Sequence, residues 1–116
     1  MNTDFIFLNP APMPYLTDCD YKRFEPDEYH SSRIVDFFVL IFMLRGSLHF
    51  IEDGIPVSVH EGEWYIQRKN LRQGADRPSP GAEYYYFHFN GIPFVPQKLR
   101  NFPAILEHRK IQANPL

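Results

Sequence analysis

The dipeptide Asp53-Gly54 stands between two short alternating segments, and this arrangement limits the possible folds more than any other feature. Asp-Gly is strongly favoured in two-residue hairpin turns, because both positions need a backbone conformation that few other residues adopt easily. Residues 47–52 before the turn and 55–59 after it alternate their side chains between two faces. The sequence therefore predicts an antiparallel hairpin over residues 47–59.

Three further segments have the character of strands. Residues 36–44 form an apolar run that is too short and too rich in β-branched and aromatic residues for a helix, and Arg45-Gly46 ends it. Residues 63–67 follow a turn at Glu61-Gly62, and residues 83–90 carry six successive aromatic rings before Gly91. Many short strands joined by tight turns are typical of an antiparallel sandwich or barrel, so we predict an all-β domain.

The two ends of the chain differ from this centre. Residues 1–20 contain three prolines that oppose helix formation, and we expect them to form an extended arm. Residues 68–82 are polar and contain glycine and proline, which predicts a loop. Residues 103–111 have a helical pattern. We therefore expect an arm over 1–20, a barrel over 21–96 and a helical segment within 97–116.

Charge and cysteine content exclude several classes of protein. The 12 basic and 14 acidic residues give a formal net charge of −2, and no cationic stripe is present to neutralise the phosphates of nucleic acid. Cys19 is the single cysteine, which excludes a disulfide framework and a thiolate metal site. No export signal is visible, and the apolar run at 37–44 is less than half a membrane span. We expect a soluble, cytoplasmic protein.

The sequence gives no positive case for catalysis. A metal-dependent cupin enzyme needs about three convergent imidazoles, commonly with two histidines one residue apart, and none of the five histidines is so spaced. The nearest fragment is His49 with Glu52, which a regular strand places on opposite faces. Cys19 has no visible partner base, and no nucleophile elbow or phosphate-binding glycine loop is present. We predict no metal, no cofactor and no catalytic residue.

The order of these segments resembles the N-terminal effector-binding domain of the AraC family of bacterial transcription regulators. The resemblance covers residues from about 30 to 91. It rests on a hydrophobic strand that ends at Gly46, the Asp53-Gly54 hairpin, the Gly62-Glu63 turn and an aromatic strand that closes on His88-Phe89.

The resemblance implies a cupin-like jelly-roll barrel that holds a small effector, often a sugar or sugar derivative. In such domains the N-terminal arm closes over the ligand, which gives Phe5, Phe7 and Tyr15 the role of a lid. A helical segment after the barrel forms a homodimer, and two helix-turn-helix motifs then bind DNA. Because residue 116 comes before any such motif, we expect an isolated sensor domain, with DNA binding only in an intact parent protein.

The aromatic strand and the segment before the first long strand supply the candidate ligand contacts. Tyr84, Tyr86 and His88 share one face of residues 83–90, and the resemblance favours the two tyrosines as effector contacts. The alternative is that they only fill the barrel. Trp64 is expected to face inward on the fourth strand, either as core or as a stacking surface. Arg33 alternates with Ser31 and Tyr29 near the barrel entrance, as a partner for an anionic effector or in a salt bridge to Asp36.

One departure from the family bears on the ligand. Where the family usually has a proline and then a histidine before the last strand, this chain has Arg68, Lys69, Asn70 and Arg72. This departure favours an anionic effector and adds Arg72 to the candidate contacts.

Two other functions compete with the sensor. One is a stand-alone cupin enzyme, an isomerase or dioxygenase acting on a sugar or small acid, which three convergent histidines would favour. The other is a barrel used only for dimerisation, with an interior filled by its own side chains. The size of the cavity distinguishes this last possibility from the sensor, because a sensor needs room for an effector.

Overall fold

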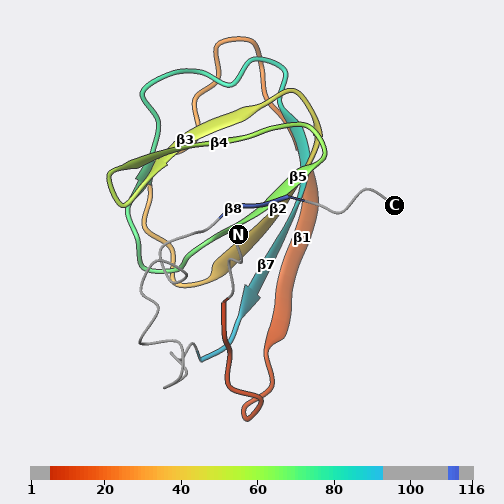
Figure 1. Cartoon of the computed structure of the whole chain (residues 1–116), viewed down its shortest axis with the longest axis vertical. Coiled ribbons are helices and arrows are strands. Elements are labelled where there is room, and N and C mark those ends of the chain that lie inside the picture. Colours follow the sequence, from red (N-terminus) through yellow and green to blue (C-terminus); the bar gives the residue numbers. More distant parts are fainter. Residues whose placement is uncertain (1–5, 93–109, 113–116) are drawn as a thin grey trace.

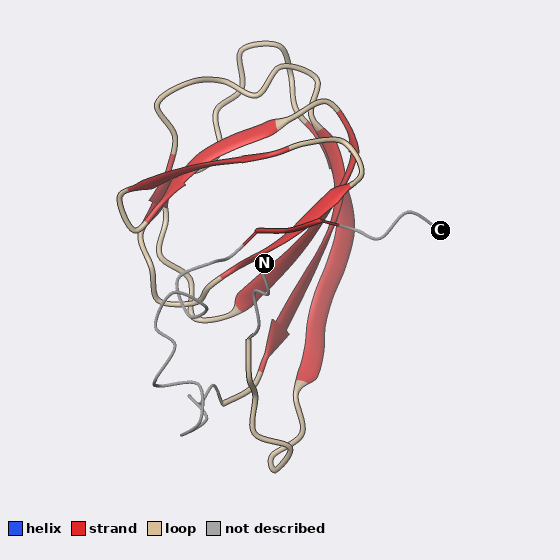
Figure 2. Ribbon diagram, in the orientation of Figure 1, coloured by secondary structure: helices blue, strands red, loops and turns tan. Residues whose placement is uncertain are grey.

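Two antiparallel β-sheets lie across one another in the computed structural model, which describes residues 6–92 and the backbone of 110–112 (Figure 1). The described residues form strands, turns and loops without a helix (Figure 2), so the all-β prediction is confirmed. It follows that this part of the chain has no helix long and apolar enough to cross a membrane. The strands are β1 (Tyr15–Arg23), β2 (Phe38–Arg45), β3 (Leu48–Glu52), β4 (Ile55–Val59), β5 (Glu63–Gln67), β6 (Gln73–Gly74), β7 (Glu83–Asn90) and β8 (Lys110–Gln112).

The smaller sheet has the strand order β4-β3-β6 and contains the predicted hairpin. Asp53 and Gly54 both have positive φ angles, 52° and 77°, as a two-residue hairpin turn requires. The flanking residues Glu52 and Ile55 pair directly across β3 and β4. The hairpin prediction is therefore confirmed.

The larger sheet has the order β1-β7-β2-β5-β8, and its register shows which face of the aromatic strand β7 is the inner one. In the β2–β7 register Met43 pairs with Tyr84, Ile41 with Tyr86 and Val39 with His88. Met43, Ile41 and Val39 are buried in the core. Because directly paired residues point to the same face, the two tyrosines and His88 lie on the inner face of the sheet.

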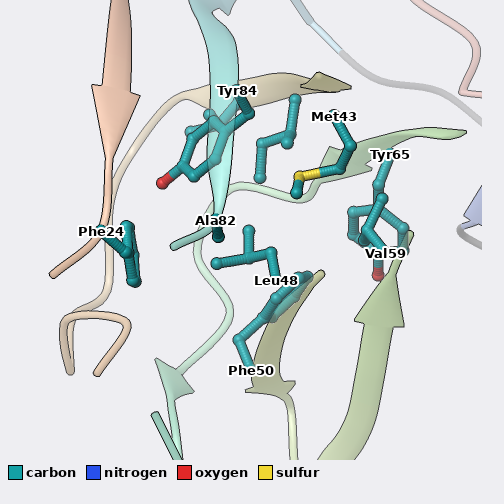
Figure 3. Close-up of a cluster of buried hydrophobic side chains, with 10 residues drawn as sticks. Phe24, Met43, Leu48, Phe50, Val59, Tyr65, Ala82 and Tyr84 are labelled. Atoms are coloured by element: carbon teal, nitrogen blue, oxygen red, sulfur yellow. The ribbon is translucent and has the colours of Figure 1, made fainter. Parts of the chain in front are cut away.

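The core lies between the two sheets (Figure 3). Buried side chains of β2, β5 and β7 in the larger sheet pack against those of β3 and β4 in the smaller sheet. Full burial of one aliphatic or aromatic side chain contributes about 1.5–3 kcal/mol. The packing of these strand faces therefore holds the sheets together. The buried cluster comprises Phe24, Val39, Ile41, Met43, Leu48, Phe50, Val59, Tyr65, Ala82 and Tyr84.

A buried carboxylate also joins the sheets. Glu52 of β3 is fully buried, and the Tyr65 hydroxyl of β5 donates a hydrogen bond of 2.5 Å to its Oε1. The backbone N–H of Arg68 donates to the other oxygen, Oε2, at 2.8 Å. These bonds satisfy a carboxylate that would otherwise be costly to bury.

The structure shifts the predicted boundaries on both sides of the central strands. Residues 15–20, which were predicted as part of the extended arm, lie in β1 and pair with β7. The expected helix at 103–111 is wrong at its end, because Lys110–Gln112 forms β8 beside β5, and the rest of that helix lies outside the described residues. The predicted loop 68–82 contains the short strand β6, which pairs with β3.

Candidate functional site

A cavity of about 250 Å³ opens against the inner face of the larger sheet. Its walls come from β1, β2, β5 and β7 and from the segment 24–33 that precedes β2. Most of the predicted ligand contacts line it: Tyr29, Ser31, Arg33, Tyr84, Tyr86 and His88. Tyr29 and Ser31 are exposed, so the cavity opens to solvent at that side.

β6 holds Arg33 in place through its backbone. The Arg33 N–H donates to the Gln73 carbonyl at 2.9 Å, and the Gln73 N–H donates back to the Arg33 carbonyl at 2.8 Å. This pair of bonds is an isolated antiparallel bridge between the segment 24–33 and β6. A short strand within the predicted loop therefore positions the most basic group of the site.

The Arg33 guanidinium has neutral protein partners. Its Nε donates to Gln73 Oε1 at 2.9 Å, and its Nη2 makes a long contact of 3.5 Å with Gln67 Oε1. Within residues 6–92 no carboxylate forms an ion pair with Arg33, so the alternative salt bridge to Asp36 is not formed. Burial lowers the pKa of this guanidinium, but arginine stays charged at neutral pH. The cavity thus contains a half-buried cation without a counter-anion.

His30 and Gln67 form a neutral network beside this cation. The carbonyl of Ser31 can only accept, so His30 Nδ1 donates to it at 2.8 Å. His30 Nε2 then accepts from Gln67 Nε2 at 3.0 Å, which orients Gln67 Oε1 toward Arg33. Burial lowers the pKa of His30 to about 4, with Arg33 adding to the shift, so His30 is neutral at pH 7.

Aromatic rings form the floor of the cavity. The ring centroids of Tyr84 and Tyr86 are 6.4 Å apart, and those of Tyr86 and His88 are 5.0 Å apart. Burial raises the pKa of both tyrosines and lowers that of His88, so all three are neutral at pH 7. Figure 3 shows the Tyr84 hydroxyl pointing away from Met43, on the side where Phe24 lies.

Two predicted contacts do not reach the cavity. Trp64 pairs with Phe42 on the outer face of the larger sheet, while its neighbours Tyr65 and Gln67 are buried on the inner face. The inward orientation predicted for Trp64 is therefore wrong. The alternation of β5 was placed one residue out of phase, and a shift of one residue turns each side chain to the opposite face. Arg72 is exposed, and its backbone carbonyl accepts a hydrogen bond from Asp53 N–H away from the cavity wall.

Two of the predicted lid residues, Phe7 and Tyr15, also lie outside the cavity wall. Phe7 is half-buried, and Tyr15 is 58% exposed at the start of β1, where it pairs with Asn90. Phe5 lies outside the described residues. The arm instead contacts the end of β7, because Asn9 N–H donates to the Ile92 carbonyl at 2.8 Å.

Sequence reasoning missed two polar residues of the cavity wall, His30 and Gln67, the ion pair of Lys22 and Glu28 in the same wall, and Gln73, which holds Arg33. Gln67 and Gln73 are fully buried polar side chains on strands. Gln67 lies on the same strand face as the buried Tyr65, and a polar residue in such a position is the signal that could have identified Gln67 from the sequence. No comparable pattern marks His30 or Gln73.

The histidine and glutamate that the sequence offered as the nearest fragment of a metal site do not converge. His49 and Glu52 lie on opposite faces of β3, as predicted, with His49 Nδ1 2.8 Å from Ser58 Oγ and Glu52 in the core. Among residues 6–92 and 110–112 no group of three histidine, cysteine or acidic side chains could hold a metal ion.

The cavity can therefore enclose a small molecule against aromatic rings and offer one cation without a counter-anion, Arg33, to an anionic group, since the other cation of its wall, Lys22, is paired with Glu28 at 2.6 Å. Its tyrosine hydroxyls can donate or accept hydrogen bonds, while Arg33 only donates. The chain matches no protein-family model and no curated protein sequence.

Proposed function

We propose that this chain is the sensing domain of an AraC-type transcription regulator and that its cavity binds a small effector with an anionic group. The proposal includes a cupin-like jelly roll as the fold family, a cytoplasmic parent protein that forms a homodimer, and DNA binding outside this chain. The sequence resemblance supports the family, and the half-buried, unpaired Arg33 is the observation that carries the proposed ligand class.

An anion would complete the interactions of Arg33. A buried cation is normally paired, because removal of charge from water costs free energy that an opposite charge offsets. Here the partners are amide oxygens of two glutamines, and one of those contacts is long. A carboxylate or phosphate could accept two parallel hydrogen bonds from a guanidinium, a geometry that lysine cannot match.

The size and walls of the cavity limit the effector further. A volume of about 250 Å³ lies just below the usual range of roughly 300–1,000 Å³ for ligand pockets. The effector is therefore small, of the order of a sugar acid or a short organic acid. Tyr84 and Tyr86 offer ring faces to its apolar part and hydroxyls to its polar rim.

Calorimetric titration of the chain with sugar acids, sugar phosphates, small carboxylates and matched neutral sugars tests the ligand class. Anionic members should bind and their neutral counterparts should not. Arg33→Gln should weaken binding roughly ten- to hundredfold, the equivalent of a hydrogen bond to a charged group. Arg72→Gln, the same change outside the cavity, should leave affinity within about twofold. Equal binding of neutral sugars, with no effect of Arg33→Gln, would contradict an anion site.

A reporter assay tests the sensing role separately. The whole chain is fused to a DNA-binding domain that needs dimerisation, and transcription is measured with and without the anion found by calorimetry. We expect expression to change with the ligand in the wild-type fusion and not in the Arg33→Gln fusion. A fusion that binds the ligand without any change in expression would exclude the sensor and leave only a binding protein.

A further inference from the structure

Two carboxylates continue the cavity side of β1 beyond the cavity wall. In the β1–β7 register Asp20 pairs with Tyr86, and Asp18 pairs with His88. Directly paired residues place their Cβ atoms about 4.5–5.5 Å apart on the same face of a sheet. Because Tyr86 and His88 line the cavity, both aspartates lie beside its edge.

These carboxylates have no cationic partner in the described part of the chain. Lys22, the nearest cation on the same face of β1, is already paired with Glu28 at 2.6 Å. Asp20 Oδ1 accepts only a hydrogen bond from the N–H of Tyr21, at 2.7 Å. The cavity therefore contains a cation without a counter-anion, Arg33, and has two exposed carboxylates without a cationic partner near its edge, next to the ion pair of Lys22 and Glu28 in its wall.

The aromatic row lies within the electrostatic reach of both charges. Arg33 acts with burial to lower the pKa of His88, whereas Asp18 opposes that shift. Asp20 and Asp18 add to the effect of burial in raising the pKa of Tyr86. The opposite charges thus act on neighbouring side chains of one strand, Tyr86 and His88, both of which line the cavity.

The Tyr84 hydroxyl indicates independently that the cavity can bind a ligand. Tyr84 is 7% exposed and lines the cavity. None of the hydrogen bonds among the described residues involves its hydroxyl, which is therefore available to a ligand in the cavity. Its ring contacts are with Phe24 and Tyr86.

We propose that the effector is dipolar, with its anionic group on Arg33 and an ammonium group toward Asp18 and Asp20. Small amino acids and their close relatives carry this pair of charges, and they are of a size that suits the cavity. This inference rests on the proposed anion site and adds a requirement for a positive charge on the same ligand.

Matched ligand triplets test the requirement in the whole chain. Leucine is compared with 4-methylpentanoate, which lacks the amine, and with 3-methylbutylamine, which lacks the carboxylate. Phenylalanine, 3-phenylpropanoate and 2-phenylethylamine form a second set. We expect at least one amino acid to bind roughly three- to tenfold more tightly than its deaminated acid, the range for a charge-assisted contact that remains partly in water. The amines alone should not bind measurably.

Two variants locate the second charge. The double variant Asp18→Asn/Asp20→Asn should lower the affinity for the amino acid roughly three- to tenfold. The affinity for the deaminated acid should stay unchanged or rise. Asp76→Asn, at an exposed carboxylate outside the cavity wall, should leave both affinities unchanged.

The outcomes separate the two proposals. Binding of the deaminated acids as tightly as the amino acids, with sensitivity to Arg33→Gln, would overturn the dipolar ligand and leave the anion site intact. Equal loss of both ligand types in the double aspartate variant would also overturn it, since the carboxylates would then act on the fold. If no member of either triplet binds, the amino-acid class is wrong, and the wider anion panel alone decides the proposed function.

Discussion

His30 donates from Nδ1 to the Ser31 carbonyl and accepts from Gln67, so the folded chain holds it in the neutral form. Its pKa is about 4 in the folded state, lowered mainly by burial, and about 6.5 when the chain is unfolded. The unfolded state therefore binds more protons between these values. The neutral His30 should therefore make its full contribution to the free energy of unfolding above about pH 6.5. The free energy of unfolding should then fall by up to about 3 kcal/mol as the pH drops to about 4.

Urea unfolding of the wild type and of His30→Gln across this pH range measures the effect. Glutamine retains a donor and an acceptor but does not titrate. The free energy of unfolding of the variant should therefore fall much less than that of the wild type between about pH 6.5 and 4. His60→Gln, at an exposed histidine, is the control and should keep the wild-type profile. An unchanged slope in His30→Gln would assign the decline to other groups.

Residue type and alternation were sufficient to predict part of the site. Arg33, Tyr84, Tyr86 and His88 could be chosen because they alternate along extended segments and carry groups that bind ligands. Trp64 was placed on the wrong face because periodicity gives the spacing of a strand and leaves its phase open. Gln73 reaches Arg33 across the fold, and no local pattern contains that information.

Among the elements, β3 and β5 are joined by the buried contact between Glu52 and Tyr65. Glu52→Gln replaces one accepting oxygen by an NH₂ group, which would face the donor at Tyr65 or at the Arg68 N–H. A buried polar group that loses its partner costs about 1–3 kcal/mol, and we expect a destabilisation of that size. Thermal and urea unfolding measure it, with Glu61→Gln at an exposed site as the control.

A result within about 0.5 kcal/mol of the wild type for Glu52→Gln would mean that the site repacks around the amide. Tyr65→Phe gives a second reading of the same contact. It removes the hydroxyl that donates to the Glu52 carboxylate, so it should also destabilise the chain.

The central elements were predictable and the outer ones were not. The strands at 36–44, 47–52, 55–59, 63–67 and 83–90 stood out because apolar or aromatic residues and tight turns define them locally. β1 carries charged residues at several positions and lies at the edge of the sheet, where such residues are tolerated and deter further pairing. Its conformation depends on the ladder with β7, which a reading along the sequence does not reveal.

At the scale of the whole molecule, the arm before β1 contacts the end of β7 that carries His88. A Cβ at Gly91 would lie 3.2 Å from a Leu8 side-chain atom and 3.3 Å from one of Pro14, so the arm packs closely there. Deletion of residues 1–13 keeps β1 intact, unlike deletion to residue 20. We expect this deletion to weaken effector binding about threefold or more, because it removes the packing at the end of the strand that carries His88.

Calorimetry with the best anionic ligand measures this effect, and urea unfolding of the same variant shows whether the fold persists. Unchanged affinity in a stably folded variant would exclude the arm from ligand binding.

The all-β class was predictable at this scale, because turns and alternation repeat along the chain. The mutual placement of the two sheets depends on packing between residues far apart in the sequence.

The pairing of β1 with β7 also has a consequence for how the molecule is made. Thr17 Oγ1 donates to the His88 carbonyl across a separation of 71 residues, and the cavity has walls from both of these strands. Contacts between such distant residues form late and slow the search for the native state, because a large loop must close first. During synthesis, the cavity therefore cannot form until β7 has left the ribosome. A ligand that binds the cavity, as we propose, would bind only after β7 has joined the sheet, and its binding would add to the stability of the chain against proteolysis.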